Sequence, residues 1–492
     1  MQLQISVGET FFTRLYRMTL RLALIIGLAC LGTLFTGCVG PKPAPTDHPL
    51  PTPLKPLRYA IVEGDGAASL QELIQAWAAK HGIAAASINP AEADLLILQG
   101  TAWPSLASTG QLVPIPASFM DENSPAQWGQ LLPAYQSSLP NWGTQKYAVP
   151  LTASAFGLVW RKDLFDAAAM STAKLATYED VADAALNYTA ATKKPAIAAL
   201  PTEPGKVFQQ FAQLAACYDR APSGGGKAAA DGVDYVRRGL SFLIQNETGV
   251  VRLDAPAFGE AFRWFARTAP ARAQTGDALT QLEAGTAAIA ILSLADIARL
   301  PKDESGFVDG RYGIGPLPGT RKYFNAKGDA MPVPTPNYVP YTGGCGFVGV
   351  VTKSAANQAD CWALLAHLAS PATQETLLSD PRVGMLPLRK SVKSLDSRTF
   401  RRYRLDDARA TTLANAIQQQ LGLGTLNPAL APKTPAQAEV VRLIGEQVVA
   451  AGSGKIAAGE AQRNAIAAWQ SQADRTPPDT WKDWRRKAAG QD

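Results

Sequence analysis

The chain has 492 residues and a formal net charge of +6 at pH 7, with 47% hydrophobic and 18% charged residues. This composition is that of an ordinary globular protein with enough chain for two or three domains. The one basic block is Arg485, Arg486 and Lys487, so the charge pattern gives no indication of a nucleic-acid partner.

The first 37 residues have the features of a lipoprotein signal peptide. Three arginines precede an apolar run, residues 22–34, that is too short to span the roughly 30 Å of bilayer hydrocarbon. Residues 34–38 (LFTGC) resemble the bacterial lipobox, although Phe35 stands where a smaller aliphatic residue is commoner. We therefore expect export, lipid attachment at Cys38 and an extracytoplasmic location at a bacterial membrane. The alternative is an uncleaved signal-anchor helix.

A proline-rich linker is predicted at residues 38–57. Its composition favours extended polyproline II and cannot bury a core. Such a stiff segment would hold a folded body away from the bilayer. A disordered tail without a mechanical role fits the same composition.

The folded body is predicted to begin as an α/β layer. Residues 57–62 are β-prone, and residues 69–72 (SLQE) form a potential capping box for a helix that Gly82 would end. Residues 94–98 (DLLIL) are a continuous apolar run, typical of a strand covered on both faces. Strands that alternate with helices in this way indicate a parallel sheet.

Alternation of strands and helices continues along the chain. We predict strands at residues 147–149 and 156–160, helices at 178–192 and 204–218, and a helix capped by Asp254. A flexible Gly- and Pro-rich tract is expected at 313–346, followed by a strand at 346–351 and a helix with Cys361, Trp362, Leu365 and Leu368 inward. The last third should include a helix capped by Thr434, with Val441, Ile444 and Val448 inward.

Cysteine and histidine usage limits the possible chemistry. Beyond the signal region the cysteines are Cys217, Cys345 and Cys361, and the chain's three histidines are scattered. No CxxC motif or Cys/His cluster with metal-ligand spacing occurs, so we expect neither a metal nor another cofactor. These three cysteines can form at most one intramolecular disulfide, and the third cysteine then remains a free thiol. Catalysis by histidine is likewise not indicated.

Six segments match, in order, segments of a known family. They are residues 94–115 (DLLIL, Trp103 and GQLVPI), 147–165 (YAVPL and LVWRKDLF), 282–289 (LEAGTAAI), 315–319 (GPLPG), 344–365 (GCGFVGVV leading into CWALL) and 384–391 (GMLPLRKS). Together they resemble the extracellular solute-binding proteins of ABC importers, the maltose-binding-protein-like family, over most of residues 58–470. Trp160 and Arg161 replace the family's usual Tyr-Asn pair.

The resemblance implies an α/β fold, a two-lobed clamshell of the type II periplasmic-binding-protein class with C-terminal helices. Lobe one would comprise residues 57–158 plus 347–392, and lobe two residues 159–346 plus 393–474. Residues 475–492 are expected to be a polar tail. Closing such a cleft excludes water and adds contacts from both sides, which suits reversible capture of a ligand.

The resemblance also implies a function without catalysis. The chain would be the substrate-binding protein of an ABC transporter, a monomer that holds a small solute, most simply a carbohydrate, and meets the permease subunits. Two alternatives are a surface receptor or sensor without a transporter and a glycoside hydrolase. A hydrolase needs two cleft carboxylates at a defined separation, and the acids Glu63, Asp65, Glu203 and Asp296 show no recognisable catalytic pattern in the sequence.

The same resemblance suggests which side chains contact the solute. Aromatic rings stack on sugar rings, whereas carboxylates and hydroxyls bond sugar hydroxyls. Ser293 stands where many relatives have a tryptophan, and Tyr341 is a candidate to replace that ring. The expected ligand-binding residues are Trp103, Thr152, Ser154, Glu203, Phe208, Ser293 and Tyr341.

Five of these residues also have a structural explanation. Trp103 would pack on its own lobe, and the hydroxyls of Thr152 and Ser154 would cap a loop. Glu203 would favour the N-terminus of the following helix electrostatically. Tyr341, near a hinge, would be a packing residue.

The implied lobes also suggest a disulfide. Cys217 and Cys345 would both fall in lobe two, and Cys361 in lobe one. Because a bridge between lobes would oppose hinge motion, the expected pair is Cys217–Cys345.

Overall fold

The computed structural model describes residues 56–132, 135–136, 139–154, 156–172, 175–220, 242–245, 248–300, 302–303, 306–307, 311–325, 327–339, 346–390, 403, 405, 407–421 and 433–491. All of them belong to one compact unit that begins at Leu54. The expected signal peptide, the lipidation site Cys38 and the linker up to residue 55 lie outside the described residues, as do Tyr341 and Cys345.

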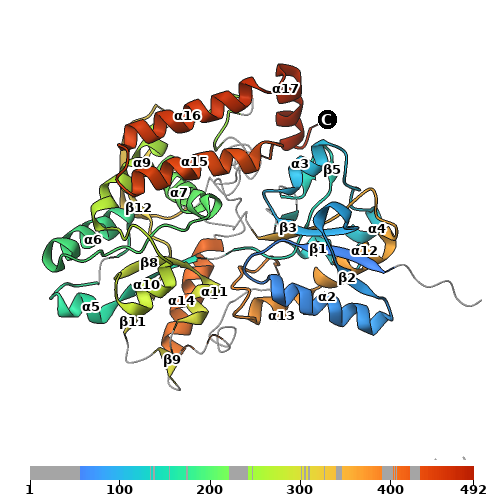
Figure 1. Ribbon diagram of the computed structural model, residues 1–492, viewed down its shortest axis with the longest axis horizontal. Helices are drawn as coiled ribbons and strands as arrows, with labels where there is room; N and C mark the ends of the chain where they lie inside the picture. Colours follow the sequence, from blue (N-terminus) through green and yellow to red (C-terminus); the bar gives the residue numbers. More distant parts are fainter. Residues whose placement is uncertain are drawn as a thin grey trace, which may run out of the picture. The chain divides into compact units, whose positions relative to one another are not determined.

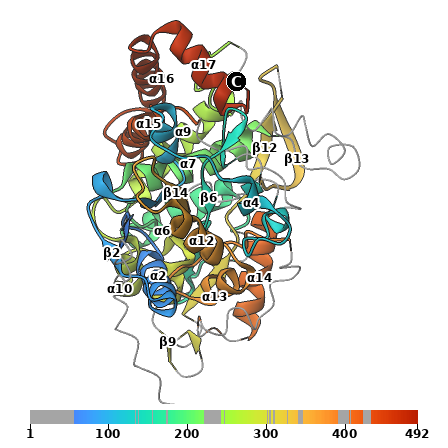
Figure 2. The same ribbon diagram turned by 90° about the vertical axis from the view of Figure 1, so that its right-hand side faces the viewer.

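The first of two main sheets has five strands in the order β2-β1-β3-β14-β6. β1 (Leu57–Ile61) is parallel to β2 (Ala85–Ser87) and β3 (Leu95–Gln99), whereas β14 (Phe347–Val351) runs antiparallel to β3 and β6 (Val149–Pro150). All of β14 is buried, as expected for a strand covered on both faces. We use the name lobe one for this sheet, the hairpin of β4 (Asn141–Trp142) and β5 (Gln145–Lys146), and helices α2 (Ala67–His81), α3 (Trp103–Ser108), α4 (Ala117–Met120), α12 (Gln358–Leu368) and α13 (Pro371–Ser379) (Figures 1 and 2).

The second main sheet has three antiparallel strands in the order β11-β7-β8. β7 (Phe156–Arg161) lies between β8 (Ile289–Ser293) and β11 (Tyr312–Gly315). Lobe two comprises this sheet, the strand pairs β9 (Lys302–Asp303) with β10 (Gly306–Phe307) and β12 (Thr320–Phe324) with β13 (Ala330–Asn337), and helices α5 (Lys162–Ala167), α6 (Tyr178–Thr192), α7 (Pro204–Asp219), α9 (Pro256–Thr268), α10 (Ala278–Ala284), α11 (Leu294–Arg299), α14 (Asp407–Leu421), α15 (Gln437–Gly452) and α16 (Ala458–Asp474).

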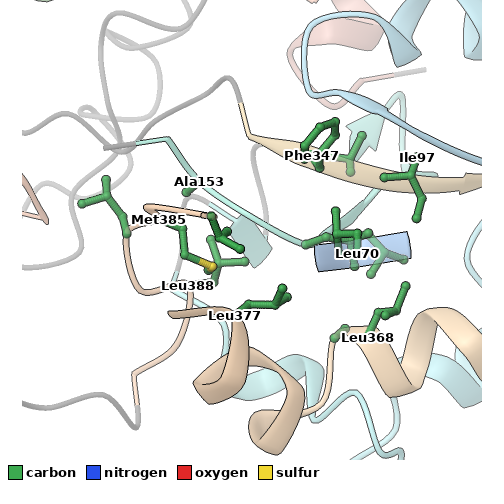
Figure 3. Packing of buried hydrophobic residues seen from close by; sticks show 14 of the residues in the cluster. Leu70, Ile97, Ala153, Phe347, Leu368, Leu377, Met385 and Leu388 are labelled. Carbon is green, nitrogen blue, oxygen red and sulfur yellow. The ribbon is translucent and has the colours of Figure 1, made fainter. Parts of the chain in front are cut away.

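Two clusters of buried apolar side chains hold these elements together. The first core surrounds the five-stranded sheet and continues onto α10, α11 and α14 of lobe two; Figure 3 shows Leu70, Phe347 and Met385 within it. The second core lies among α6, α7, α9, α15 and α16. It is rich in aromatic rings, and the ring centroids of Phe211 and Phe262 are 4.6 Å apart. Full burial of one such side chain contributes roughly 1.5–3 kcal/mol.

Hydrophobic spacing located most of the regular elements correctly. α6 has the predicted bounds, and α7 extends one residue beyond its predicted end. Gly82 ends α2 in the left-handed conformation, at φ 65°, as predicted. Val441, Ile444 and Val448 are buried on α15, and Cys361, Leu365 and Leu368 on α12. Trp362, also predicted to point inward, is only partly buried against the first core.

The three predicted helix caps are wrong. α2 begins one turn earlier, after Gly66, and the Ser69 hydroxyl instead donates a hydrogen bond to Asp380 Oδ2 at 2.8 Å. Asp254 is not the cap of α9, because Ala255 occupies that position. Ala436, not Thr434, precedes α15. In the case of Ser69, a side chain that caps helices in other contexts is here used for a tertiary contact.

Two segments expected to lack regular structure contain it. The tract 313–346 includes most of β11 and the β12–β13 pair. Within the expected polar tail 475–492, Pro478–Ala488 form helix α17 (Figure 1). Trp481 packs against the second core and Trp484 against the first. The i, i+3 spacing of these tryptophans is a helical signal within a segment whose overall composition is polar.

Candidate functional site

A cavity of about 820 Å³ lies between elements of the two sheets. Lobe one contributes the loop after β1, the end of β3 and residues 152–154, while lobe two contributes the end of β8 and the N-terminal ends of α7, α10 and α11. Its volume is within the range of about 300–1,000 Å³ that is usual for small-ligand sites. The carboxyl ends of the parallel strands β1 and β3 face it, where ligands of α/β sheets characteristically bind.

Backbone hydrogen bonds fix the cavity wall where the chain passes from lobe one to lobe two. Phe347 O accepts from Leu151 N at 2.9 Å and from Thr152 N at 3.1 Å, and Ala153 O accepts from Leu386 N at 2.8 Å. The Thr152 hydroxyl, which is buried, accepts from Phe347 N at 2.8 Å. Since this bond uses a lone pair, the hydroxyl proton remains available for donation.

Two glycines allow the backbone to come close around the cavity. A Cβ atom at Gly346 would lie 2.0 Å from Thr152 O. At Gly384, where φ is +54°, it would lie 2.2 Å from Ala295 N in α11. Because Gly384 has no side chain, the backbone of lobe one can contact the start of α11 in lobe two directly at the edge of the cavity.

The start of α11 presents a carboxylate to the cavity. Ser293 caps this helix by accepting from Asp296 N at 3.1 Å, and its hydroxyl donates to Asp296 Oδ2 at 2.9 Å. Arg299 donates to Asp296 Oδ1 at 3.0 Å from a side chain that is 70% exposed. Burial and the negative charge of Asp65 raise the pKa of the Asp296 carboxyl. Asp65 lies in lobe one, so charges from both lobes act on each other here.

Further charged side chains line the lobe-two wall. Glu203 precedes Pro204, the first residue of α7, and pairs with Lys206 at 3.3 Å. Their side chains are 67% and 46% exposed, so the pair contributes only about 0–1 kcal/mol to stability. Asp277 caps α10 by accepting from Thr280 N at 2.9 Å. The carboxylates of this wall are therefore held at helix starts, where the helix dipole favours negative charge.

Residues 62–375, which span both walls of this cavity, match the family model of the bacterial extracellular solute-binding proteins. The chain belongs to this family.

Solved structures share the fold of this solute-binding protein. A cyclic alpha-maltosyl-1,6-maltose binding protein from Arthrobacter globiformis has 14% identity and a TM-score of 0.59, with 86% of this chain and 100% of that chain covered. Maltose-bound MalE3 of T. maritima has 16% identity, a TM-score of 0.59 and coverages of 85% and 99%. An ABC transporter solute-binding protein of Agrobacterium radiobacter K84 in complex with ribitol has 16% identity, a TM-score of 0.59 and coverages of 85% and 100%. The predicted two-lobed α/β clamshell is confirmed. None of the curated proteins matches the sequence.

Four of the seven expected ligand-binding residues of the solute-binding protein line the cavity: Thr152, Ser154, Glu203 and Ser293. Trp103 is fully buried in the first core and Phe208 is 3% exposed in the second, and neither lines the cavity. Neither ring has a face available for stacking on a ligand, so the expected stacking role is wrong for both in this structure. Tyr341 lies outside the described residues.

Four further residues that the sequence did not indicate as ligand-binding line the cavity: Asp65, Phe156, Gln209 and Asp296. Asp65 follows β1 after a short turn. A charged residue just beyond the carboxyl end of a buried parallel strand is a sequence signal for a ligand-binding residue. Asp296 carries no such signal, because its position depends on how α11 approaches lobe one.

Within the described part of the solute-binding protein, Cys217 and Cys361 are buried free thiols. Cys217 is therefore not in the expected bridge to Cys345, and burial raises the pKa of its thiol to about 12. The described residues include no cluster of three or more His, Cys, Asp or Glu side chains suited to a metal ion. No helix among them is both long and apolar enough to cross a bilayer.

Proposed function

We propose that this solute-binding protein captures a small carbohydrate in the cavity between its lobes and passes it to the permease of an ABC importer. The supporting observation is the cavity itself, whose polar walls come from both lobes and whose volume is about 820 Å³. A ligand that touches both walls binds the closed form better than the open form, and only such differential affinity drives closure.

The proposed contacts follow from the groups on each wall. Thr152 and Ser154 would bond solute hydroxyls from lobe one, whereas Glu203 and Ser293 would do so from lobe two. Carboxylates and hydroxyls accept and donate the hydrogen bonds that sugar hydroxyls make. We also propose that the chain crosses between lobe one and lobe two near residues 158, 346 and 392.

We further propose that the chain works as a monomer held outside the cytoplasm by a lipid on Cys38. Acylation of this cysteine would keep the binding protein near its permease after removal of the signal peptide. The solute would be released unchanged, in keeping with a family of binding proteins.

A ligand panel tests the proposal. Purified protein without residues 1–37 is screened by thermal shift against neutral and amine-bearing sugars and polyols. A cognate solute at a hundredfold excess over its Kd should stabilise the fold by about 2.7 kcal/mol. Small-angle scattering should then show a smaller radius of gyration, and chromatography should recover the solute intact. A panel without any shift would contradict carbohydrate capture, and hydrolysis of a glycoside would contradict binding without turnover.

A further inference from the structure

The charges that line the cavity are unbalanced. Among the described residues, its walls carry the carboxylates of Glu63, Asp65, Glu203, Asp277 and Asp296 and one ammonium group, that of Lys206. The whole chain, by contrast, has a net charge of +6. A cavity that is acidic in a basic protein focuses a negative potential on whatever enters it.

The single ammonium group does not neutralise this wall. Lys206 is already paired with Glu203 at 3.3 Å. Arg299 approaches Asp296 from outside the cavity, and its side chain is 70% exposed. Within the described part of the chain, Glu63 and Asp65 form no ion pair with any cation.

The acidic groups face one another across the cavity. Asp65 belongs to the loop after β1 in lobe one, and Asp296 to α11 in lobe two. Burial first, and repulsion by Asp65 after it, raise the pKa of the Asp296 carboxyl, although the Ser293 hydrogen bond and the charges of Arg299 and Lys206 oppose this shift. Because any approach of the lobes strengthens this repulsion, closure around a neutral solute is opposed, while a cation between the walls would favour closure.

The remaining lining defines the rest of the ligand. Hydroxyl and amide groups of Ser154, Gln209 and Gln210 offer hydrogen bonds to polar substituents. Two aromatic residues line the cavity within the described part of the chain. Phe347 is only 1% exposed, whereas Phe156 is half-buried. At most one partly exposed ring therefore stands beside five carboxylates, so charge and hydrogen bonds outweigh aromatic faces in this lining.

We infer that the solute of this protein carries an ammonium group, which the facing carboxylates Asp65 and Asp296 bind between the lobes. The inference rests on the proposed capture of a solute in this cavity and specifies the class of solute. An amino sugar and a linear polyamine both supply the required chemistry. No described cluster of acids is suited to a bare metal ion, and the cavity is far larger than one ion.

Matched ligands separate charge from shape. Isothermal titration calorimetry compares D-glucosamine with D-glucose and N-acetyl-D-glucosamine, the β-1,4 dimer of glucosamine with cellobiose, and spermidine with 1,8-octanediol. Each ammonium-bearing probe that fits should bind about tenfold or more tightly than its neutral counterpart. This ratio should fall between about 0.01 and 1 M NaCl, over which the Debye length shortens from about 30 Å to about 3 Å.

Each outcome has a definite meaning. Preference for the amino sugars supports both the inference and carbohydrate capture. Binding of spermidine alone supports the cationic solute and overturns the carbohydrate. Equal or tighter binding of the neutral sugars overturns the inference and leaves carbohydrate capture intact, whereas no binding of any probe overturns both.

Isosteric variants test which groups are responsible. Asp65→Asn and Asp296→Asn should each reduce the preference for the ammonium probe severalfold, and Asp296→Asn keeps an oxygen that can accept the bond from Ser293. Glu122→Gln, at an exposed site outside the cavity, should leave the preference unchanged. Removing either carboxylate should not lower the melting temperature of the unliganded protein, because it relieves repulsion. An unchanged preference in both variants, with folding intact, would refute the assignment.

Discussion

Lys433 is a buried cation at the contact between the two lobes. Only 7% of the residue is exposed, and its Nζ donates to Asn141 O in the β4–β5 hairpin at 3.0 Å. Lys146 donates to the Oδ1 of the same asparagine at 3.1 Å. Burial first, and the charge of Lys146 second, lower the pKa of Lys433 from 10.5 to about 7.

This lowered pKa makes the stability of the fold depend on pH. Between pH 7 and 10.5 the unfolded chain holds a proton on Lys433 that the folded chain has lost. The free energy of unfolding should therefore rise with pH in this window, by up to about 1.4 kcal/mol per pH unit from this group. Below pH 7 the folded protein has the full cost of burying the charge, on the order of 5 kcal/mol.

Lys433→Met tests this reasoning. The variant removes the buried charge and also a hydrogen bond worth about 1 kcal/mol. It should be more stable than the parent protein at pH 6, and the advantage should shrink or reverse by pH 10. Urea unfolding at one-unit steps of pH measures the difference between the two profiles, and Lys455→Met, at an exposed lysine, serves as the control. Parallel profiles for the parent and Lys433→Met from pH 6 to pH 10 would refute the argument.

Three further predictions follow from the site and the N-terminus. Gly384→Ala places a Cβ atom 2.2 Å from Ala295 N at a φ of +54° and should lower the free energy of unfolding by about 1–3 kcal/mol or more. Gly82→Ala is the control, because its φ is +65° and no atom lies within 4 Å of the new Cβ; it should lower the free energy of unfolding by only about 1–2 kcal/mol. An equal loss for the two variants in urea titrations would contradict the close approach at Gly384. Glu203→Ala should weaken binding of the cognate solute by about 1.5–3 kcal/mol by calorimetry without loss of folding, and unchanged affinity would remove Glu203 from the site. Cys38→Ser should abolish incorporation of labelled palmitate in a bacterial host, and labelling that persists would rule out this anchor.

The sequence predicted the fold well because the fold depends on local signals. Apolar spacing placed α6 and α7 within one residue, since one face of each helix must be buried wherever it packs. Helix caps were harder to predict. Ser69 had the right neighbours for a capping box, but a partner more than 300 positions away, Asp380, takes its hydroxyl.

The candidate site was predicted only in part, for a related reason. Thr152 and Ser154 lie on a connection between sheets, so their place along the chain already brings them to the cavity. Trp103 follows a strand end in the same way, yet the short helix α3 turns its ring into the core. Asp65 and Asp296 face each other only because the two lobes are assembled around the cavity. The sequence around either residue alone does not indicate this.

The position of α17 bears on how the protein loses its structure on heating. This helix packs Trp481 against one core and Trp484 against the other, and Gly143 N in lobe one donates to its Lys487 O at 2.8 Å. If one lobe unfolded alone, α17 would lose some of its packing contacts, although the other lobe also packs against this helix. Shared elements of this kind couple regions that would otherwise open separately. The heat-absorption curve of the intact chain should therefore contain one peak whose van't Hoff and calorimetric enthalpies agree, and removing residues 477–492 should split or broaden that peak.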